Sequence, residues 1–250
     1  MSGIKNVVLV HGAWADGSCW SKVLPILWAS GLNAVAVQHP LSSLAEDVAS
    51  TNRIVNAQDG PVLLVGHSYG GAIITEAGNN PKVAGLVYVA AFAPDAGESA
   101  GSLAAGYPTT PIFSQLQPIA DGFVLLTAKG VHEDFAQDLS EAEREMVLAV
   151  QGATNAAVFG TPISKAAWRD KPNWFVVAEQ DRAIAPQQEG RYCEADGGKN
   201  TDPFQQPPAH AVAARESGRA CDSSCSFSRG QRRCIDSSLS FEVESKPRYV

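Results

Sequence analysis

One short motif, between an apolar run and an apolar, helix-compatible segment, most constrains how this chain can fold. Residues 66–70 read Gly-His-Ser-Tyr-Gly and fit the pattern G-x-S-x-G. The run 62–65 (Val-Leu-Leu-Val) comes before it and the segment 71–78 follows it. In a strand–turn–helix, such a motif holds the serine at the tip of a buried strand with its hydroxyl exposed. The sequence therefore predicts that Ser68 is a nucleophile.

The rest of the N-terminal part alternates short apolar runs with helical patterns. This alternation predicts a parallel sheet with helices on both faces. The expected strands are 7–10, 33–37, 62–65, 83–89 and 174–178, and the expected helices are 18–30, 41–57 and 71–78. Parallel sheets carry their sites beyond the carboxyl ends of the strands. We therefore expect one rim to hold His11, Gly12, His39, Ser68 and Phe92.

Residues 95–161 differ, because glycines and prolines are scattered and no clear strand is visible. One amphipathic helix is expected over 140–150, where Ser140 and Glu143 form the capping-box pattern S-x-x-E. A helical lid over the sheet rim would form a pocket. Its aromatic residues either line that pocket or are ordinary core: Phe113, Phe123, Phe135 and Phe159.

Composition excludes several classes of protein. The net charge of −7 argues against a nucleic-acid binder. No apolar run approaches the ~20 residues that span a membrane, and the first run is too short for a signal-peptide core. The five cysteines show no paired metal-ligand spacing. We expect a cytoplasmic protein that binds neither nucleic acid nor membrane; its oligomeric state is left open.

A serine nucleophile needs a base, an acid that orients the base, and donors for the oxyanion. In a strand–turn–helix of this kind the donors are backbone N–H groups, here of Tyr69 and of Ala13 in the loop after the first strand. Asp181, which follows a strand, is the preferred acid, and Asp95 is the alternative. The histidines outside the C-terminal 61 residues suit structural or peripheral roles better: His11, His39, His67 and His132.

Three motifs in this order resemble the α/β-hydrolase superfamily, and more narrowly the small esterases grouped with plant methylesterases and hydroxynitrile lyases. They are residues 11–14 (His-Gly-Ala-Trp), 66–71 and 178–186. The resemblance covers residues 4 to about 189. It implies Ser68 as nucleophile, Asp181 as acid and the N–H groups of Ala13 and Tyr69 as oxyanion donors. It also implies hydrolysis of small carboxylic esters without a cofactor.

The resemblance further implies a histidine after one more strand, about 25–30 residues beyond the acid. No strand-like run follows Pro186, and His210 comes directly after Pro207-Pro208-Ala209. Composition also changes near Gly190: the net charge is −8 over 1–189 and +1 over 190–250. The genetic code allows codons from about Gly190 that, read one base later, encode strings similar to the family's closing segment, with a histidine at position 207. We therefore hypothesise a frameshifted tail, in which the cysteines are incidental.

The chain is thus divided into a hydrolase domain over 1–189, with a lid insertion over about 95–165, and an atypical tail over 190–250 that is expected to be irregular or disordered. Without the last strand, the sheet would keep an open edge. The prediction is a serine hydrolase of small esters, impaired if the base is lost. The alternatives are a hydroxynitrile-lyase-like enzyme, a non-catalytic small-molecule binding protein, and the product of a damaged gene.

Overall fold

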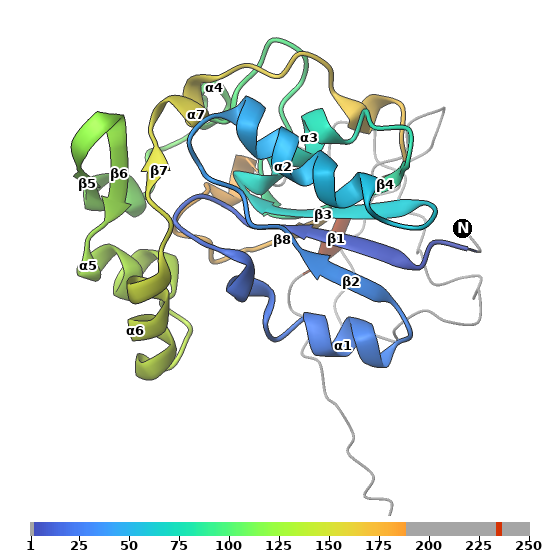
Figure 1. The fold of residues 1–250 in the computed structure, drawn as a ribbon. Coiled ribbons are helices and arrows are strands. Elements are labelled where there is room, and N and C mark those ends of the chain that lie inside the picture. Colours follow the sequence, from blue (N-terminus) through green and yellow to red (C-terminus); the bar gives the residue numbers. More distant parts are fainter. Residues whose placement is uncertain (1–2, 189–233, 237–250) are drawn as a thin grey trace, which may run out of the picture.

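The computed structural model describes residues 3–188 and 234–236 (Figure 1). Its centre is a six-stranded sheet in the order β2-β1-β3-β4-β8-β9, and every neighbouring pair is parallel. The strands are β1 (Asn6–Val10), β2 (Asn33–Ala36), β3 (Val62–Ser68), β4 (Val83–Ala91), β8 (Asn173–Val177) and β9 (Cys234–Asp236). The predicted parallel α/β sheet is therefore confirmed.

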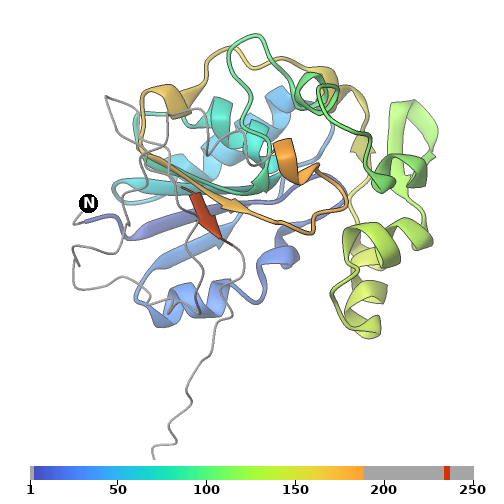
Figure 2. The same cartoon turned by 180° about the vertical axis from the view of Figure 1, so that it is seen from behind.

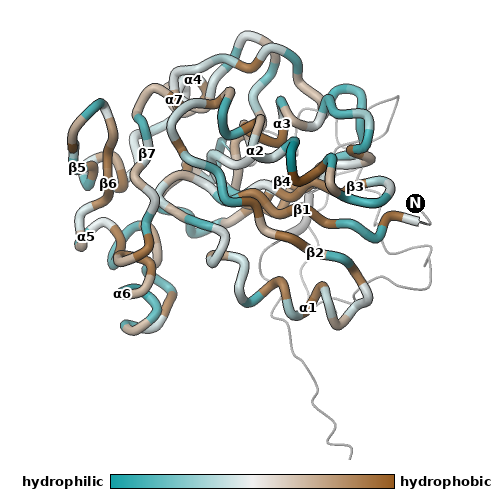
Figure 3. The backbone as a smooth tube through the Cα atoms, in the orientation of Figure 1, coloured by the Kyte–Doolittle hydropathy of each residue, from teal (hydrophilic) through white to brown (hydrophobic). Residues whose placement is uncertain are grey.

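The alternation of side chains along β1 explains why both faces of the sheet are covered. Val8 and Val10 belong to the larger core cluster, whereas Val7 and Leu9 pack with Trp20 in a second cluster. Successive strand residues point to opposite faces, so an entirely apolar strand needs cover on both sides. Figure 1 shows α2 and α3 on one face and α1 on the other, and Figure 3 shows the apolar strands between them.

The helices around this sheet differ from the expected ranges where local chemistry breaks a helix. They are η1 (Gly17–Trp20), α1 (Leu24–Ala29), α2 (Leu44–Asn56), α3 (Gly70–Ala77) and η5 (Ala167–Arg169). The single helix expected over 18–30 is wrong: it is divided before Pro25, whose ring lacks an N–H and disfavours a continuous helix. Helix α2 starts three residues later than expected, because Ser43 caps it and Leu41 has a positive φ of 58°.

The insertion between β4 and β8 contains more than helices. Its elements are α4 (Ala100–Ala104), η2 (Pro111–Gln115), β5 (Leu116–Pro118), η3 (Ala120–Gly122), β6 (Phe123–Leu126), α5 (Ala128–Gly130), the π-helix η4 (Val131–Phe135), α6 (Glu141–Val150), β7 (Thr154–Asn155) and α7 (Ala157–Gly160). The capping box predicted for Ser140 and Glu143 is present. The expectation of no strand is wrong, since β5, β6 and β7 form a small antiparallel sheet.

The insertion lies beyond the carboxyl ends of the central strands (Figures 1 and 2). It is thus placed over the rim at which β1, β3 and β4 end. None of the helices within the described residues is long and apolar enough to cross a membrane.

Strand β9 corrects the expected sheet edge. Of the tail over 190–250, the structure describes only residues 234–236, and these pair in parallel with β8 at Phe175, Val176 and Val177. The expectation of an unpaired edge beside β8 is therefore wrong at these three positions. His210 and Pro207 lie outside the described residues, and so does almost all of the hypothesised frameshifted segment.

Candidate active site

Ser68 lies at the turn where β3 ends and α3 begins. Its φ is +54°, an uncommon conformation for a residue other than glycine. A Cβ on Gly66 would lie 2.6 Å from the carbonyl oxygen of Gly70, and one on Gly70 would lie 2.6 Å from that of His11. These spaces are too small for any side chain. The flanking glycines are therefore required, as the motif predicts, and a strained serine backbone of this kind is typical of functional sites.

The loop after β1 runs directly against Ser68. A Cβ on Gly12 would lie 2.8 Å from Ser68 Cβ and 3.3 Å from Ser68 Oγ. Ala13 follows Gly12 and is buried, as is Tyr69. Within the described residues, neither the Ala13 N–H nor the Tyr69 N–H donates a hydrogen bond. Buried N–H groups are rarely left without an acceptor, so these two are suited to bind a ligand oxygen.

Asp181 lies in the turn after β8. Its Oδ1 accepts hydrogen bonds from the backbone N–H groups of Ala183, at 2.7 Å, and Ile184, at 2.8 Å. Its charge also acts on the ring of His67, beside Ser68. Burial lowers the pKa of His67, and the Asp181 carboxylate opposes that effect. The Asp181 carboxylate is thus held by two backbone N–H groups and lies within electrostatic range of the nucleophile turn.

The alternative acid, Asp95, is engaged elsewhere. Its carboxylate forms a bidentate ion pair with Arg169. The guanidinium carbon of Arg169 lies over the Trp168 ring, 4.8 Å from the ring centroid. Asp95 Oδ1 also accepts from the N–H of Ala96. These contacts join the start of the insertion to the segment before β8. They support Asp181 over Asp95 as the candidate acid.

Two of the histidines stack on each other at the rim. The rings of His11 and His39 are 3.7 Å apart and nearly parallel. His11 Nδ1 lies 2.9 Å from the Gly12 oxygen, so this nitrogen carries the proton. Burial, followed by the neighbouring His39, lowers the pKa of His11 to about 4. His11 is therefore neutral at physiological pH and ties the loop together, in agreement with the structural role expected from the sequence.

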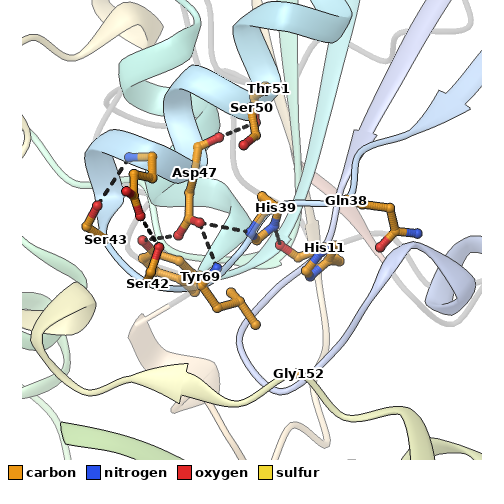
Figure 4. Close-up of polar contacts among 12 residues, drawn as sticks. His11, Gln38, His39, Ser42, Ser43, Asp47, Ser50, Thr51, Tyr69 and Gly152 are labelled. Carbon is orange, nitrogen blue, oxygen red and sulfur yellow. Dashed lines mark hydrogen bonds and ion pairs between the residues drawn. The ribbon is translucent and has the colours of Figure 1, made fainter. Parts of the chain in front are cut away.

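A buried carboxylate network supports this loop, and sequence reasoning missed it. Asp47 is fully buried and accepts hydrogen bonds from the Tyr69 hydroxyl at 3.0 Å and the Leu41 N–H at 2.8 Å (Figure 4). The Nδ1 atom of His39 lies 3.4 Å from Asp47 Oδ1, and its Nε2 lies 3.0 Å from the His11 oxygen. One feature of the sequence could have revealed Asp47. It lies three residues after Leu44, on the apolar face of α2, where a carboxylate is expected to be buried and to need partners.

The other two histidines in the described part of the chain are peripheral. His67 is edge-on to Trp20, at 6.4 Å between ring centroids. His132 lies in the insertion and pairs with Glu145 at 3.1 Å. Among the described residues, no histidine forms a hydrogen bond with Ser68. The candidate nucleophile, acid and donors thus share one rim, and the predicted general base lies outside residues 3–188 and 234–236.

Comparison with known proteins identifies the family to which this arrangement belongs. A family model described as "Alpha/beta hydrolase family" matches residues 7–215. The chain belongs to the α/β-hydrolase family. Its relatives include the carbendazim-hydrolysing esterase of Nocardioides sp. (strain SG-4G), 34% identical over 110 residues, which are 38% of this chain and 45% of that protein. Methylesterase 8 of Arabidopsis thaliana is 26% identical over 72% of this chain and 74% of its own length.

Solved structures show the same fold. Polyneuridine aldehyde esterase superposes with a TM-score of 0.66 at 18% identity, over 77% of this chain and 87% of that one. The expected α/β-hydrolase fold and the relation to ester hydrolases are therefore confirmed. The match to the carbendazim-hydrolysing esterase spans less than half of that protein. The similarity therefore shows the family of this chain, whereas its own activity is proposed from the site.

A cleft of about 260 Å³ lies between the acid turn and the insertion of this α/β-hydrolase. Its walls include Phe92 at the end of β4, Ile184 after the acid, and Phe113 and Tyr107 from the insertion. Ser68 is not among its lining residues, but its carbonyl oxygen accepts from the Phe92 N–H at 3.2 Å. The cleft therefore borders the rim next to the nucleophile turn.

The remaining aromatic residues of the insertion divide between the two expected roles. Phe113 lines the cleft, whereas Phe135 and Phe159 pack on Trp14 at centroid distances of 6.4 and 5.5 Å. The ring of Phe159 also contacts that of Tyr69, at 5.8 Å. Phe123 is the first residue of β6 and does not line the cleft. Two of these four rings, Phe135 and Phe159, thus pack against the loop or the turn that carries the two N–H groups.

Proposed function

We propose that this α/β-hydrolase cleaves small carboxylic esters through an acyl-enzyme formed on Ser68. One observation carries the proposal: the strained turn at Ser68 lies against the Gly12 loop, beside two buried N–H groups without a described acceptor. A nucleophile next to preorganised donors is the arrangement that acyl transfer needs. The relatives named as esterases support the same chemistry.

The reaction starts with attack of Ser68 Oγ on the ester carbonyl carbon. The carbonyl oxygen becomes negative and accepts hydrogen bonds from the backbone N–H groups of Ala13 and Tyr69. The bond to the alcohol oxygen then breaks, and this oxygen takes the proton that Ser68 has given to the general base. Water next attacks the acyl-enzyme with the same base, which releases the acid and restores the Ser68 hydroxyl.

Asp181 is proposed to orient that base. Its hydrogen bonds to Ala183 and Ile184 leave the second carboxylate oxygen available for a histidine. The sequence offers two candidates for the general base. One is His210, and the other is a histidine that a shift of the reading frame would have removed from position 207. In the second case, only residual turnover is expected, because oxyanion stabilisation and binding act without a base.

The proposal is tested with p-nitrophenyl acetate as substrate and the purified full chain. Wild-type protein should release p-nitrophenol, and Ser68→Ala should lower kcat far below the wild-type value. Ser114→Ala, at an exposed serine of the insertion, should leave kcat unchanged. Equal turnover by the wild type and Ser68→Ala would refute the proposal. Cleavage of a cyanohydrin without hydrolysis of esters would favour the lyase alternative.

The class of substrate and partner follows from the same site. A cleft of about 260 Å³ suits a small molecule, and its wall is largely apolar. The net charge of −7 supports the absence of a nucleic-acid partner. We keep the cytoplasm as the predicted compartment.

A further inference from the structure

Strand β7 of the insertion is hydrogen-bonded to the loop that carries the Ala13 N–H. Thr154 is fully buried, and its Oγ1 accepts a hydrogen bond from the backbone N–H of Trp14 at 3.0 Å. The same Oγ1 donates to the Gly152 oxygen at 3.2 Å. Trp14 has a φ of +54°, an uncommon value for a bulky residue. The Thr154 hydroxyl therefore holds the backbone in a strained conformation one residue after Ala13.

Other contacts with the insertion also hold Trp14 in place. Its indole N–H donates to the Val124 oxygen in β6 at 3.2 Å, and its ring packs on Phe159. A Cβ on Gly152 would lie 3.0 Å from the Ala15 oxygen, so the backbone before β7 lies against the loop. A strained conformation persists only when its surroundings hold it, and here the insertion supplies those contacts.

Strand β7 also reaches the second donor, through Leu41. The Asn155 N–H donates to the Leu41 oxygen at 2.8 Å, and the Leu41 N–H donates to Asp47. Asp47 in turn accepts from the Tyr69 hydroxyl (Figure 4). The two residues of β7 thus bond directly to the loop that carries Ala13 and, through Leu41 and Asp47, connect to the side chain of Tyr69. Within this chain of contacts, Thr154 is the side chain that bonds directly to the Ala13–Trp14 loop.

We propose that Thr154 is a positioning residue for the oxyanion donors: its hydroxyl fixes the Ala13 N–H toward the oxygen that becomes negative. This inference rests on the proposed Ser68 chemistry. Donor hydrogen bonds matter most in the transition state, and small displacements of a donor weaken them sharply. Loss of the Thr154 hydroxyl therefore lowers kcat and leaves KM almost unchanged, since ground-state binding does not use these bonds.

Steady-state kinetics with p-nitrophenyl acetate test the inference in the full chain. Thr154→Val keeps the shape of the side chain and removes the hydroxyl. We expect kcat to fall about 10- to 100-fold with KM within about twofold of the wild type. Thr161→Val is the matched control, because the hydroxyl of Thr161, an exposed residue of the same insertion, bonds to the Ala157 oxygen and to no other group among the residues that the structure describes. It should leave both constants unchanged.

A second pair of variants separates positioning from folding. Thr154→Ser keeps the hydroxyl and should restore kcat to within about threefold of the wild type, whereas Thr154→Cys carries a weaker acceptor and should not. Melting temperatures identify any variant that does not fold. Equal kcat for Thr154→Ser and Thr154→Cys, or an unchanged kcat in Thr154→Val, would overturn the inference. If Ser68→Ala keeps wild-type turnover, the proposed function itself fails.

Discussion

At the scale of single residues, the site depends on the close approach of Gly12 to Ser68. The backbone of Gly12 lies so near that a methyl group would be 3.0 Å from the His67 oxygen and 2.8 Å from Ser68 Cβ. These neighbours belong to a turn that cannot move freely, because Gly66 and Gly70 are themselves tightly packed. The loop thus approaches the nucleophile this closely because residue 12 is a glycine and has no side chain.

Gly12→Ala is therefore expected to separate the donor loop from Ser68. The added methyl displaces the loop, so kcat for p-nitrophenyl acetate should fall by about 100-fold and stability by about 1–3 kcal/mol. Gly160→Ala is the control, since a Cβ there meets no atom within 4 Å. A Gly12→Ala variant with wild-type kcat would show that the loop does not contribute to the reaction.

His11 predicts how stability depends on pH. Its pKa is about 4 in the folded protein, against 6.5 when exposed. Between these pH values the unfolded chain binds more protons, so the free energy of unfolding rises with pH over this window and is flat above it. The wild type should lose about 2 kcal/mol more than His11→Asn between pH 7.5 and pH 4.5. Denaturant unfolding at both pH values measures this, and an identical loss would contradict it.

Several candidate residues of the rim could be predicted from the sequence, because each lies in a short motif that is associated with one local backbone structure. Ser68, Ala13 and Asp181 follow from a turn or a strand end read over fewer than ten residues. Asp47, Thr154 and Trp14 were missed as partners, because their contacts join segments up to 140 residues apart. Local patterns do not specify which distant backbone groups will meet.

At the scale of elements, the insertion is joined to the acid turn as well as to the donor loop. Arg182, next to Asp181, donates to Asp134 of the π-helix at 2.8 Å. The Thr110 hydroxyl donates to the Ala183 oxygen at 2.8 Å. The Asp134 side chain is 4% exposed and that of Arg182 is 48% exposed. Removing the arginine therefore leaves a buried carboxylate without its partner, whereas removing the carboxylate charge leaves an arginine that water can solvate.

This asymmetry predicts the order of two melting temperatures. Arg182→Met should lower stability by about 2 kcal/mol, and Asp134→Asn by less. Lys165→Met, which removes one partner of the exposed pair with Asp170, should change stability by no more than about 0.5 kcal/mol. Thermal unfolding followed by circular dichroism gives the order. A larger loss in Asp134→Asn than in Arg182→Met would contradict the interpretation of this pair.

The small sheet of the insertion shows why its strands were not predicted. Strands β5, β6 and β7 have three, four and two residues, too few for an alternating pattern to be recognised. The longer helix α6 was predicted, because its cap and its apolar spacing extend over ten residues. Elements that are stabilised mainly by tertiary contacts leave little signal in the sequence.

At the scale of the whole molecule, the hypothesis of a changed frame from about Gly190 stays a prediction. It requires a histidine codon, read one base later, at position 207 and no early stop codon. The nucleotide sequence decides this directly. If both conditions hold, restoring the frame should raise turnover of p-nitrophenyl acetate by about 1,000-fold or more, because the base is returned to a site that keeps its nucleophile and donors. A stop codon in the shifted frame would end the hypothesis.

The central claim is that Ser68 is the nucleophile, and covalent labelling tests it most directly. The full chain is incubated with a fluorophosphonate probe, and the modified peptide is located by mass spectrometry. We predict a single adduct on Ser68, absent in Ser68→Ala and unchanged in Ser114→Ala. Labelling at another residue, or equal labelling of Ser68→Ala, would contradict the account.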